Sequence, residues 1–191
     1  MSRRLSLTSL VLVFAATFIG AAEAQDAREP VSIGADIGSA AAGVLMGAGS
    51  VDLFAELPLS RAWSLAFEPS LYWASGTGSS VMQVNLETFA RFYFNSLFVA
   101  DRAKPVHWGA FLECGVAVVW ETMQANATIN VLSVGPEIRG GYRFVFGNSR
   151  VFLEPGVGWV ALFGTGVGST GQSYSTNSGV RLALLLGINL M

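Results

Sequence analysis

The sequence has little charge, one cysteine and one histidine. Charged residues make up 13% of its 191 residues, against about 25% in an ordinary soluble domain. Cys114 has no second cysteine with which to form an internal disulfide. His107 has no neighbouring ligands at metal-binding spacing, so no metal site is expected. The formal net charge of −2 gives no basis for nucleic-acid binding.

Long apolar runs are also missing from residues 25–191, although 52% of the whole chain is hydrophobic. A membrane-spanning helix needs about 20 consecutive, mostly apolar residues. The apolar segment 180–191 is shorter than that and contains Arg181 and Asn189. A membrane-like composition without membrane helices favours a transmembrane β-barrel.

The first residues have the pattern of a secretory signal peptide. Arg3 and Arg4 precede an apolar run over 5–22, and Ala22 and Ala24 provide small residues before a cleavage point. We therefore predict a cleaved signal peptide over 1–24 and a single domain over 25–191, the alternative being an uncleaved anchor. No cysteine lies at the cleavage point, which disfavours a lipoprotein.

Residues 82–94 alternate strictly between apolar and polar side chains. Met82, Val84 and Leu86 belong to one set, whereas Glu87 and Arg91 belong to the other. Successive side chains of a strand point to opposite faces, so this pattern predicts a strand with one apolar face. Segments of this kind, separated by turn residues, can be placed at 31–39, 49–57, 63–74, 82–94, 107–120, 132–144, 151–162 and 180–191.

The fold class predicted is all-β, an eight-stranded antiparallel up-and-down transmembrane β-barrel. The longer connections are expected at 40–48, 75–80, 95–105, 121–128 and 164–177. When alternate residues of each predicted strand are assigned to the two faces of the sheet, every charged strand residue can be placed on the inward face. An Arg or Lys on the lipid side near the bilayer middle would cost about 2–4 kcal/mol, which accounts for that placement.

Charged residues near mid-strand are predicted to form a network inside the barrel. An eight-stranded barrel is only wide enough for side chains to fill, and buried charges must be paired. We predict a lumen closed by these side chains; a gated polar path is the alternative. The predicted network residues are Glu68, Glu87, Arg91, Glu113, Glu137, Arg139, Arg143, Glu154 and Arg181.

Aromatic residues are concentrated at the ends of the predicted strands. Trp63 and Trp73 are ten residues apart, which on a tilted strand corresponds to about 25 Å of height, the thickness of an apolar band. We predict two aromatic girdles, with ordinary sheet packing as the alternative. Their predicted members are Trp63, Trp73, Phe94, Trp108, Trp120, Tyr142 and Trp159.

Three prolines lie inside predicted strands, at Pro69, Pro136 and Pro155. Proline cannot donate to a strand ladder, so local bulges are expected at these positions. A second interpretation is that they weaken strand pairing and let small molecules leave sideways.

The signal peptide, eight alternating strands and charged small lumen resemble the small eight-stranded bacterial outer-membrane barrels of the OmpA, OmpX and OmpW type. The resemblance covers residues 31–191 and rests on pattern without a diagnostic motif. It implies the bacterial outer membrane, short periplasmic turns, contact with outer-membrane lipid and the barrel-assembly machinery, and a monomer. Members of this family usually close on an aromatic residue, whereas this chain closes on Asn189-Leu190-Met191.

Catalytic, cofactor-binding and metal-binding residues are not predicted, and neither is enzyme activity. The only histidine, His107, lies at a predicted strand start and is expected to be an interfacial turn residue. The sequence therefore favours a structural or surface-interaction barrel with surface ligands as partners. The alternative, by resemblance to OmpW, is a narrow channel for small hydrophobic or polar solutes.

Overall fold

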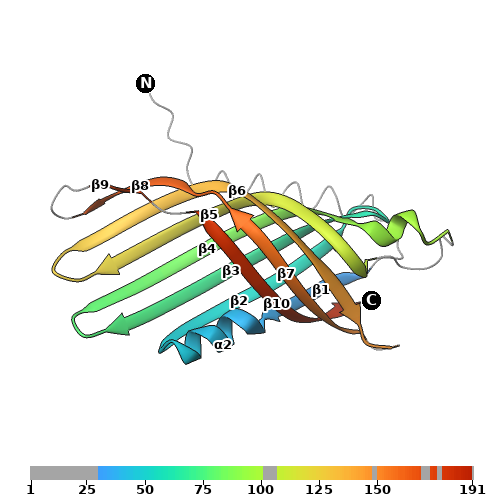
Figure 1. Cartoon of the computed structure of the whole chain (residues 1–191), viewed down its shortest axis with the longest axis horizontal. Helices are drawn as coiled ribbons and strands as arrows, with labels where there is room; N and C mark the ends of the chain where they lie inside the picture. The colour runs from blue at the N-terminus through green and yellow to red at the C-terminus, as the bar shows by residue number, and fades with distance from the viewer. Residues whose placement is uncertain (1–29, 101–106, 148–149, 169–172, 176–177, 191) are drawn as a thin grey trace, which may run out of the picture.

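The strands form a closed antiparallel barrel, which confirms the predicted fold class (Figure 1). The structure is a computed structural model that describes residues 30–100, 107–147, 150–168, 173–175 and 178–190. Within these residues the strands are β1 (Val31–Asp36), β2 (Ala48–Pro58), β3 (Trp63–Gly76), β4 (Ser79–Tyr93), β5 (Gly109–Gln124), β6 (Thr128–Val145), β7 (Val151–Val160), β8 (Phe163–Gly168), β9 (Ser173–Ser175) and β10 (Gly179–Leu190). The helices are α2 (Ile37–Leu45) and the 3-10 helix η1 (Phe94–Leu97).

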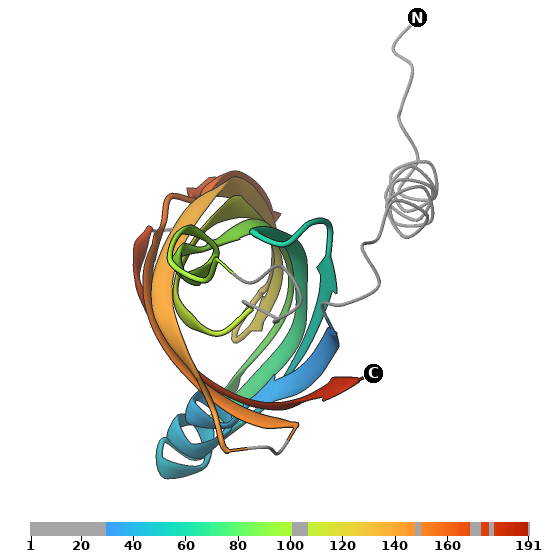
Figure 2. The ribbon, with the colours of Figure 1, turned by 90° about the vertical axis from the view of Figure 1, so that its right-hand side faces the viewer.

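Sequence neighbours pair around the barrel, and β1 pairs with β10 to close it, with Val31 opposite Leu190. Figure 2 looks along the barrel and shows the strands as a ring. We call the end with the turns at 77–78 and 125–127 the hairpin end. The end where β1 begins and β10 finishes is the termini end. The predicted signal peptide over 1–24 lies outside the described residues.

The ten strand segments correspond to eight barrel strands, because β8 continues β7 and β9 precedes β10 on the other side of the same hairpin. Both pair with β6 in one unbroken register, with Glu137 opposite Val160 and Val134 opposite Phe163. The interruption at 161–162 lies beside Pro136, which has no N–H to donate. On the other side of this hairpin, β9 pairs with β8 and β10 pairs with β7.

The expected proline bulges are not present. Pairing lapses beside each proline, between β2 and β3 at Pro69 and between β6 and β7 at Pro155. The register is the same on both sides of each lapse, so no extra residue is inserted. A missing donor interrupts a ladder without shifting it.

In β4 the apolar residues of the alternating sequence face outward and the charged residues face inward, as predicted. Met82, Val84 and Leu86 are exposed on the outer face, whereas Glu87 and Arg91 are buried inside. The other strands follow the same rule, and the single cysteine, Cys114, is exposed on the outer face of β5. The barrel therefore has an apolar exterior and a charged interior.

Several strands run further towards the hairpin end than predicted. The expected loops 75–80 and 121–128 are mostly strand, with turns at 77–78 and 125–127. Gly78 has a φ of +81°, which suits glycine and allows the tight turn. The expected loop 164–177 includes β8 and β9, and its residues 169–172 and 176–177 lie outside the described part.

The prediction for 31–48 is wrong beyond Asp36, where the chain forms α2 instead of more strand and a loop. Asp36 caps this helix, because its carboxylate accepts hydrogen bonds from the amides of Gly38 at 2.8 Å and Ser39 at 3.2 Å. Alanines at 40–42 favour a helical backbone. Gly47, with a φ of +71°, follows the helix end. No helix among the described residues is long and apolar enough to cross a membrane.

Candidate functional site

Two arginines and two glutamates from four different strands meet inside the barrel near its termini end. Arg143 of β6 contacts Glu56 of β2 at 2.6 Å and Glu154 of β7 at 2.7 Å. Arg91 of β4 contacts Glu154 at 2.9 Å. All four side chains are buried. The Arg143–Glu56 and Arg91–Glu154 contacts cross the interior between strands that are not neighbours in the sheet, whereas Arg143 and Glu154 lie on the paired strands β6 and β7.

A second group of charges continues the network towards the hairpin end. Glu113 of β5 accepts a hydrogen bond of 2.6 Å from Nε of Arg91 and also bonds Arg139 of β6. The guanidinium of Arg139 binds Glu68 of β3 with both of its terminal nitrogens, one at 2.9 Å. A two-pronged arginine–carboxylate contact of this kind is strong and orientation-specific.

Phenylalanine rings fill the space around the guanidinium groups. Arg91 lies 4.2 Å from the ring centre of Phe111, Arg143 lies 4.2 Å from that of Phe152, and Arg139 lies 4.7 Å from that of Phe89. These cation–π contacts are favourable, particularly where water is excluded. The predicted network did not include these rings. Phe89 in β4 and Phe111 in β5 nevertheless occupy inward positions in the alternating pattern of their strands.

His107 is buried at the termini end instead of lying at an interface as expected. Its ring stacks on Tyr93 at 4.7 Å, and Nε2 lies 3.1 Å from the carbonyl oxygen of Ser60. Tyr93 in turn donates a 2.9 Å hydrogen bond to Glu56. Burial lowers the pKa of His107 to about 4, and the nearby charge of Glu56 opposes this only in part. His107 is therefore neutral at pH 7.

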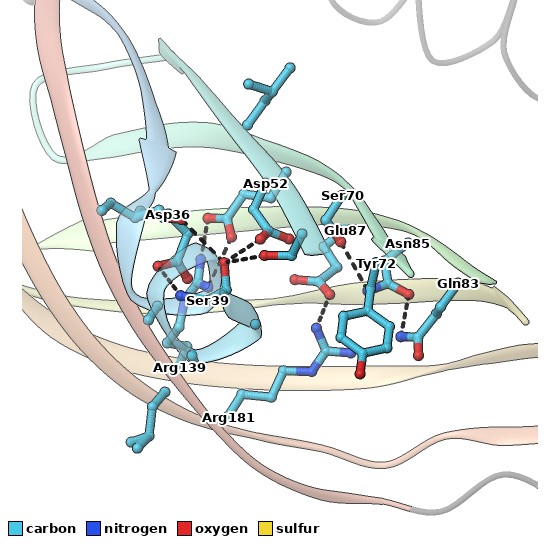
Figure 3. A pocket seen from close by; sticks show the side chains of 18 of the residues that line it. Asp36, Ser39, Asp52, Ser70, Tyr72, Gln83, Asn85, Glu87, Arg139 and Arg181 are labelled. Carbon is cyan, nitrogen blue, oxygen red and sulfur yellow. Dashed lines mark hydrogen bonds and ion pairs between the residues drawn. The ribbon is translucent and has the colours of Figure 1, made fainter. Parts of the chain in front are cut away.

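A cavity of about 430 Å³ lies beyond the Arg139–Glu68 pair, towards the hairpin end (Figure 3). On one wall Ser39 of α2 donates a hydrogen bond to Asp52 of β2. Arg181 of β10, on the other side of α2 from β2, binds Glu87 of β4. The remaining polar lining residues are Asp36, Ser50, Glu68, Ser70, Tyr72, Gln83, Asn85 and Arg139.

The cavity contains more carboxylates than the arginines around it can neutralise. Arg139 and Arg181 are each bound to a glutamate. Asp36 accepts hydrogen bonds from backbone amides, and no ion pair joins Asp36 or Asp52 to an arginine or lysine among the described residues. The cavity can therefore offer hydrogen-bond acceptors with a negative charge.

The structure brings eight of the nine predicted network residues into ion pairs. The ninth, Glu137, is buried on the inner face of β6, and neither of its carboxylate oxygens has a hydrogen-bond partner among the described residues. Glu56 was absent from the predicted set, although the alternating pattern of residues 49–57 places it on the inward side. Its ion pair with Arg143 makes it a central member.

The seven predicted girdle residues are all exposed on the outside of the barrel. Trp63 packs against Phe92 with ring centres 5.0 Å apart, and Tyr142 packs against Phe144 at 4.5 Å. Both contacts lie towards the termini end of their strands. Aromatic rings therefore concentrate on the outer surface beside the turns at that end.

Comparisons with protein-family models, curated proteins and solved structures find no match. Within the part of the chain that the structure describes, no three His, Cys, Asp or Glu side chains are grouped so that they could hold a metal ion.

Proposed function

We propose that this protein is an integral outer-membrane β-barrel that acts in surface interaction, with its lumen closed by side chains. The apolar exterior supports a membrane location. Large hydrophobic side chains are exposed on the outer face of every barrel strand, and charged strand residues point inward. In water this surface would greatly exceed the apolar patches of ordinary monomeric proteins. In lipid it is the favoured arrangement.

The outward aromatic residues support the same proposal. Trp63 and Trp108 lie towards the termini end, whereas Trp73 and Trp120 lie towards the hairpin end. Tryptophan is favoured at both interfaces of a bilayer because its ring has an apolar body and a polar N–H. In lipid the barrel would be a monomer. The signal peptide would direct the chain to export, and the barrel-assembly machinery would insert it into the outer membrane.

One observation carries the closed-lumen proposal: Arg143 contacts Glu56 across the interior, with side-chain exposures of 0% and 1%. Moving either charge would leave the other buried and unpaired, which is costly. An ion crossing the barrel would have to separate such pairs. The protein would then present its cavity and hairpins to surface ligands without conducting.

A narrow channel for small hydrophobic or polar solutes is the second candidate function. The cavity of about 430 Å³ favours it, because this space extends inward as far as Arg139 and Glu68. A solute would still need the network beyond these residues to rearrange. The proposal includes no enzyme activity and no cofactor.

Quenching of tryptophan fluorescence by brominated lipids tests the membrane proposal, since all five tryptophans are exposed on the outer surface. After refolding into vesicles, bromine close to the head groups should quench more than bromine deep in the acyl chains. A folded protein that stays in solution without detergent, and whose tryptophans brominated lipid does not quench, would overturn it.

A further inference from the structure

The barrel wall has a section that no strand occupies. β1 ends at Asp36, so beyond this point residues 48–52 of β2 pair only with β3. Residues 179–184 of β10 likewise pair only with β7. The helix α2 lies between these two strand edges, and Figure 2 shows it at the outer edge of the ring. This section is therefore closed by side-chain packing and a few side-chain hydrogen bonds, such as that from Ser39 to Asp52, where the rest of the wall has ladder hydrogen bonds.

Small residues let α2 lie close to both edges. A Cβ atom placed on Gly38 would lie 3.1 Å from Cβ of Leu184 in β10. One placed on Gly43 would lie 3.5 Å from the carbonyl oxygen of Ala48 in β2. The opposite side of the helix carries exposed Val44 and Leu45. The helix thus separates the polar cavity from an apolar outer surface.

The cavity reaches the outside of the barrel beside α2. Its lining includes Leu53, Met46 and Leu182, whose exposed fractions are 53%, 81% and 78%. Leu53 and Leu182 belong to the outward set of their strands, whereas Asp52 and Arg181 next to them point inward. The cavity is therefore polar within the barrel and apolar at its mouth in the wall.

The charge inside the cavity selects what can enter it. Asp36 and Asp52 have no cationic side chain paired with them among the described residues. The carboxylate of Glu137 is buried without a hydrogen-bond partner and interacts electrostatically with Glu87 and Arg181, which line the cavity. An anion would meet repulsion here, whereas a cation would supply the missing positive charge.

We infer that the cavity binds a cationic amphiphile, with its ammonium group beside Asp52 and Asp36 and its hydrocarbon chain leaving the barrel beside α2. The chain passes Leu182 and Met46 and continues into the surrounding lipid. The acidic residues favour a positively charged head group in the ligand. The apolar mouth favours a hydrocarbon chain. This inference rests on the proposed membrane location, because lipid receives the chain.

Calorimetric titration of the full barrel in phosphatidylcholine nanodiscs tests the ligand class. The probes are dodecyltrimethylammonium below its micelle concentration, dodecyl sulfate and tetramethylammonium, with empty nanodiscs as the blank. Dodecyltrimethylammonium should bind saturably at one site and at least about tenfold more tightly than either other probe. Equal binding of dodecyl sulfate would overturn the charge selection. Equal binding of tetramethylammonium would overturn the role of the chain.

Two pairs of variants locate the site. Asp52→Asn should weaken dodecyltrimethylammonium by about tenfold or more, whereas Glu121→Gln removes a carboxylate that does not line the cavity and should have little effect. Leu182→Trp should obstruct the mouth and weaken the chain-bearing probe alone. Val157→Trp, at the outward residue paired with Leu182, is its control. Unchanged affinity in both Asp52→Asn and Leu182→Trp would overturn the inference.

Failure of this inference can be told apart from failure of the proposed function. A barrel that enters nanodiscs, remains folded and binds none of the cationic probe would contradict only the ligand assignment. A chain that does not enter lipid at all would contradict the membrane proposal before any titration begins.

Discussion

Arg143 and Glu56 form an ion pair of 2.6 Å across the interior of the barrel, near its termini end. They belong to β6 and β2, and three barrel strands lie between these two in either direction around the wall. The pair therefore joins opposite sides of the barrel. Glu154 shares the same arginine, at 2.7 Å, and also contacts Arg91. These four residues thus form one connected group of buried charges.

Replacing Arg143 with methionine should strongly destabilise the barrel. The substitution leaves Glu56 and Glu154 buried without one of their cationic partners, and breaking a buried pair costs about 3–5 kcal/mol. The same change at Arg181, whose side chain is 27% exposed, leaves only one buried glutamate without its cation and should cost less, about 1–3 kcal/mol. Urea unfolding in lipid vesicles measures both free energies. Equal losses in the two variants would contradict the importance of burial.

The contribution of His107 to the stability of the barrel should fall as the pH decreases from about 6.5 to about 4. Burial lowers the pKa of His107 from 6.5 to about 4, so in this range the unfolded chain binds a proton that the folded protein does not. The contribution of His107 to the free energy of unfolding has its full value above pH 6.5. At pH 4 it should be lower by about 3 kcal/mol.

The variant His107→Phe isolates this effect, because phenylalanine keeps a ring against Tyr93 and cannot titrate. The difference in unfolding free energy between the two proteins should change with pH between 6.5 and 4 and be flat above 7. A difference that stays constant from pH 4 to 8 would show that His107 is not the titrating group.

Two adjacent glycines of β6, Gly140 and Gly141, should differ in how much alanine destabilises the barrel. A Cβ atom on Gly141 would lie 2.5 Å from the carbonyl oxygen of Pro155 and 2.6 Å from the ring of Phe111, so Gly141→Ala should cost about 1–3 kcal/mol. On Gly140 the nearest atom is 3.6 Å away, and Gly140→Ala should change stability by less than about 0.5 kcal/mol. Urea midpoints compare them. A larger loss at Gly140 would mean that inward and outward sides are exchanged.

Removing the cap of α2 should loosen that helix while the strands stay intact. Asp36→Ala removes the acceptor for the amides of Gly38 and Ser39, which costs about 1 kcal/mol. Hydrogen exchange should quicken across residues 37–45 and remain unchanged in the β3–β4 hairpin. Unchanged exchange in α2 would indicate that packing against β2 and β10 holds the helix without its cap.

The sequence was sufficient to predict the barrel because a strand alternates with a period of two. In β4 this period separates exposed Met82 and Val84 from buried Glu87 and Arg91 without knowledge of any partner strand. Pairing partners depend on register, and register depends on turn lengths that the sequence left open. The contact of Glu68 with Arg139 could therefore not be predicted, although both residues were placed inside.

The helix α2 was missed because its residues fit two patterns. Val31, Ile33, Ala35 and Ile37 alternate as a strand, and this pattern continues past Asp36. An aspartate followed by small helix-forming residues was the competing signal. The position of His107 also depended on tertiary structure, since its stacking on Tyr93 joins the segment before β5 to β4. A strand-by-strand interpretation contains no information of this kind.

Single-channel recording of the refolded barrel in a planar bilayer tests whether its lumen is closed. Because Arg143, Arg91, Glu56 and Glu154 are buried in one connected group, the barrel should insert and remain electrically silent. Heat-modifiable gel migration of the same preparation verifies that it is folded. A steady conductance from the folded wild-type barrel, altered by Arg143→Ala, would contradict the closed lumen and support the channel.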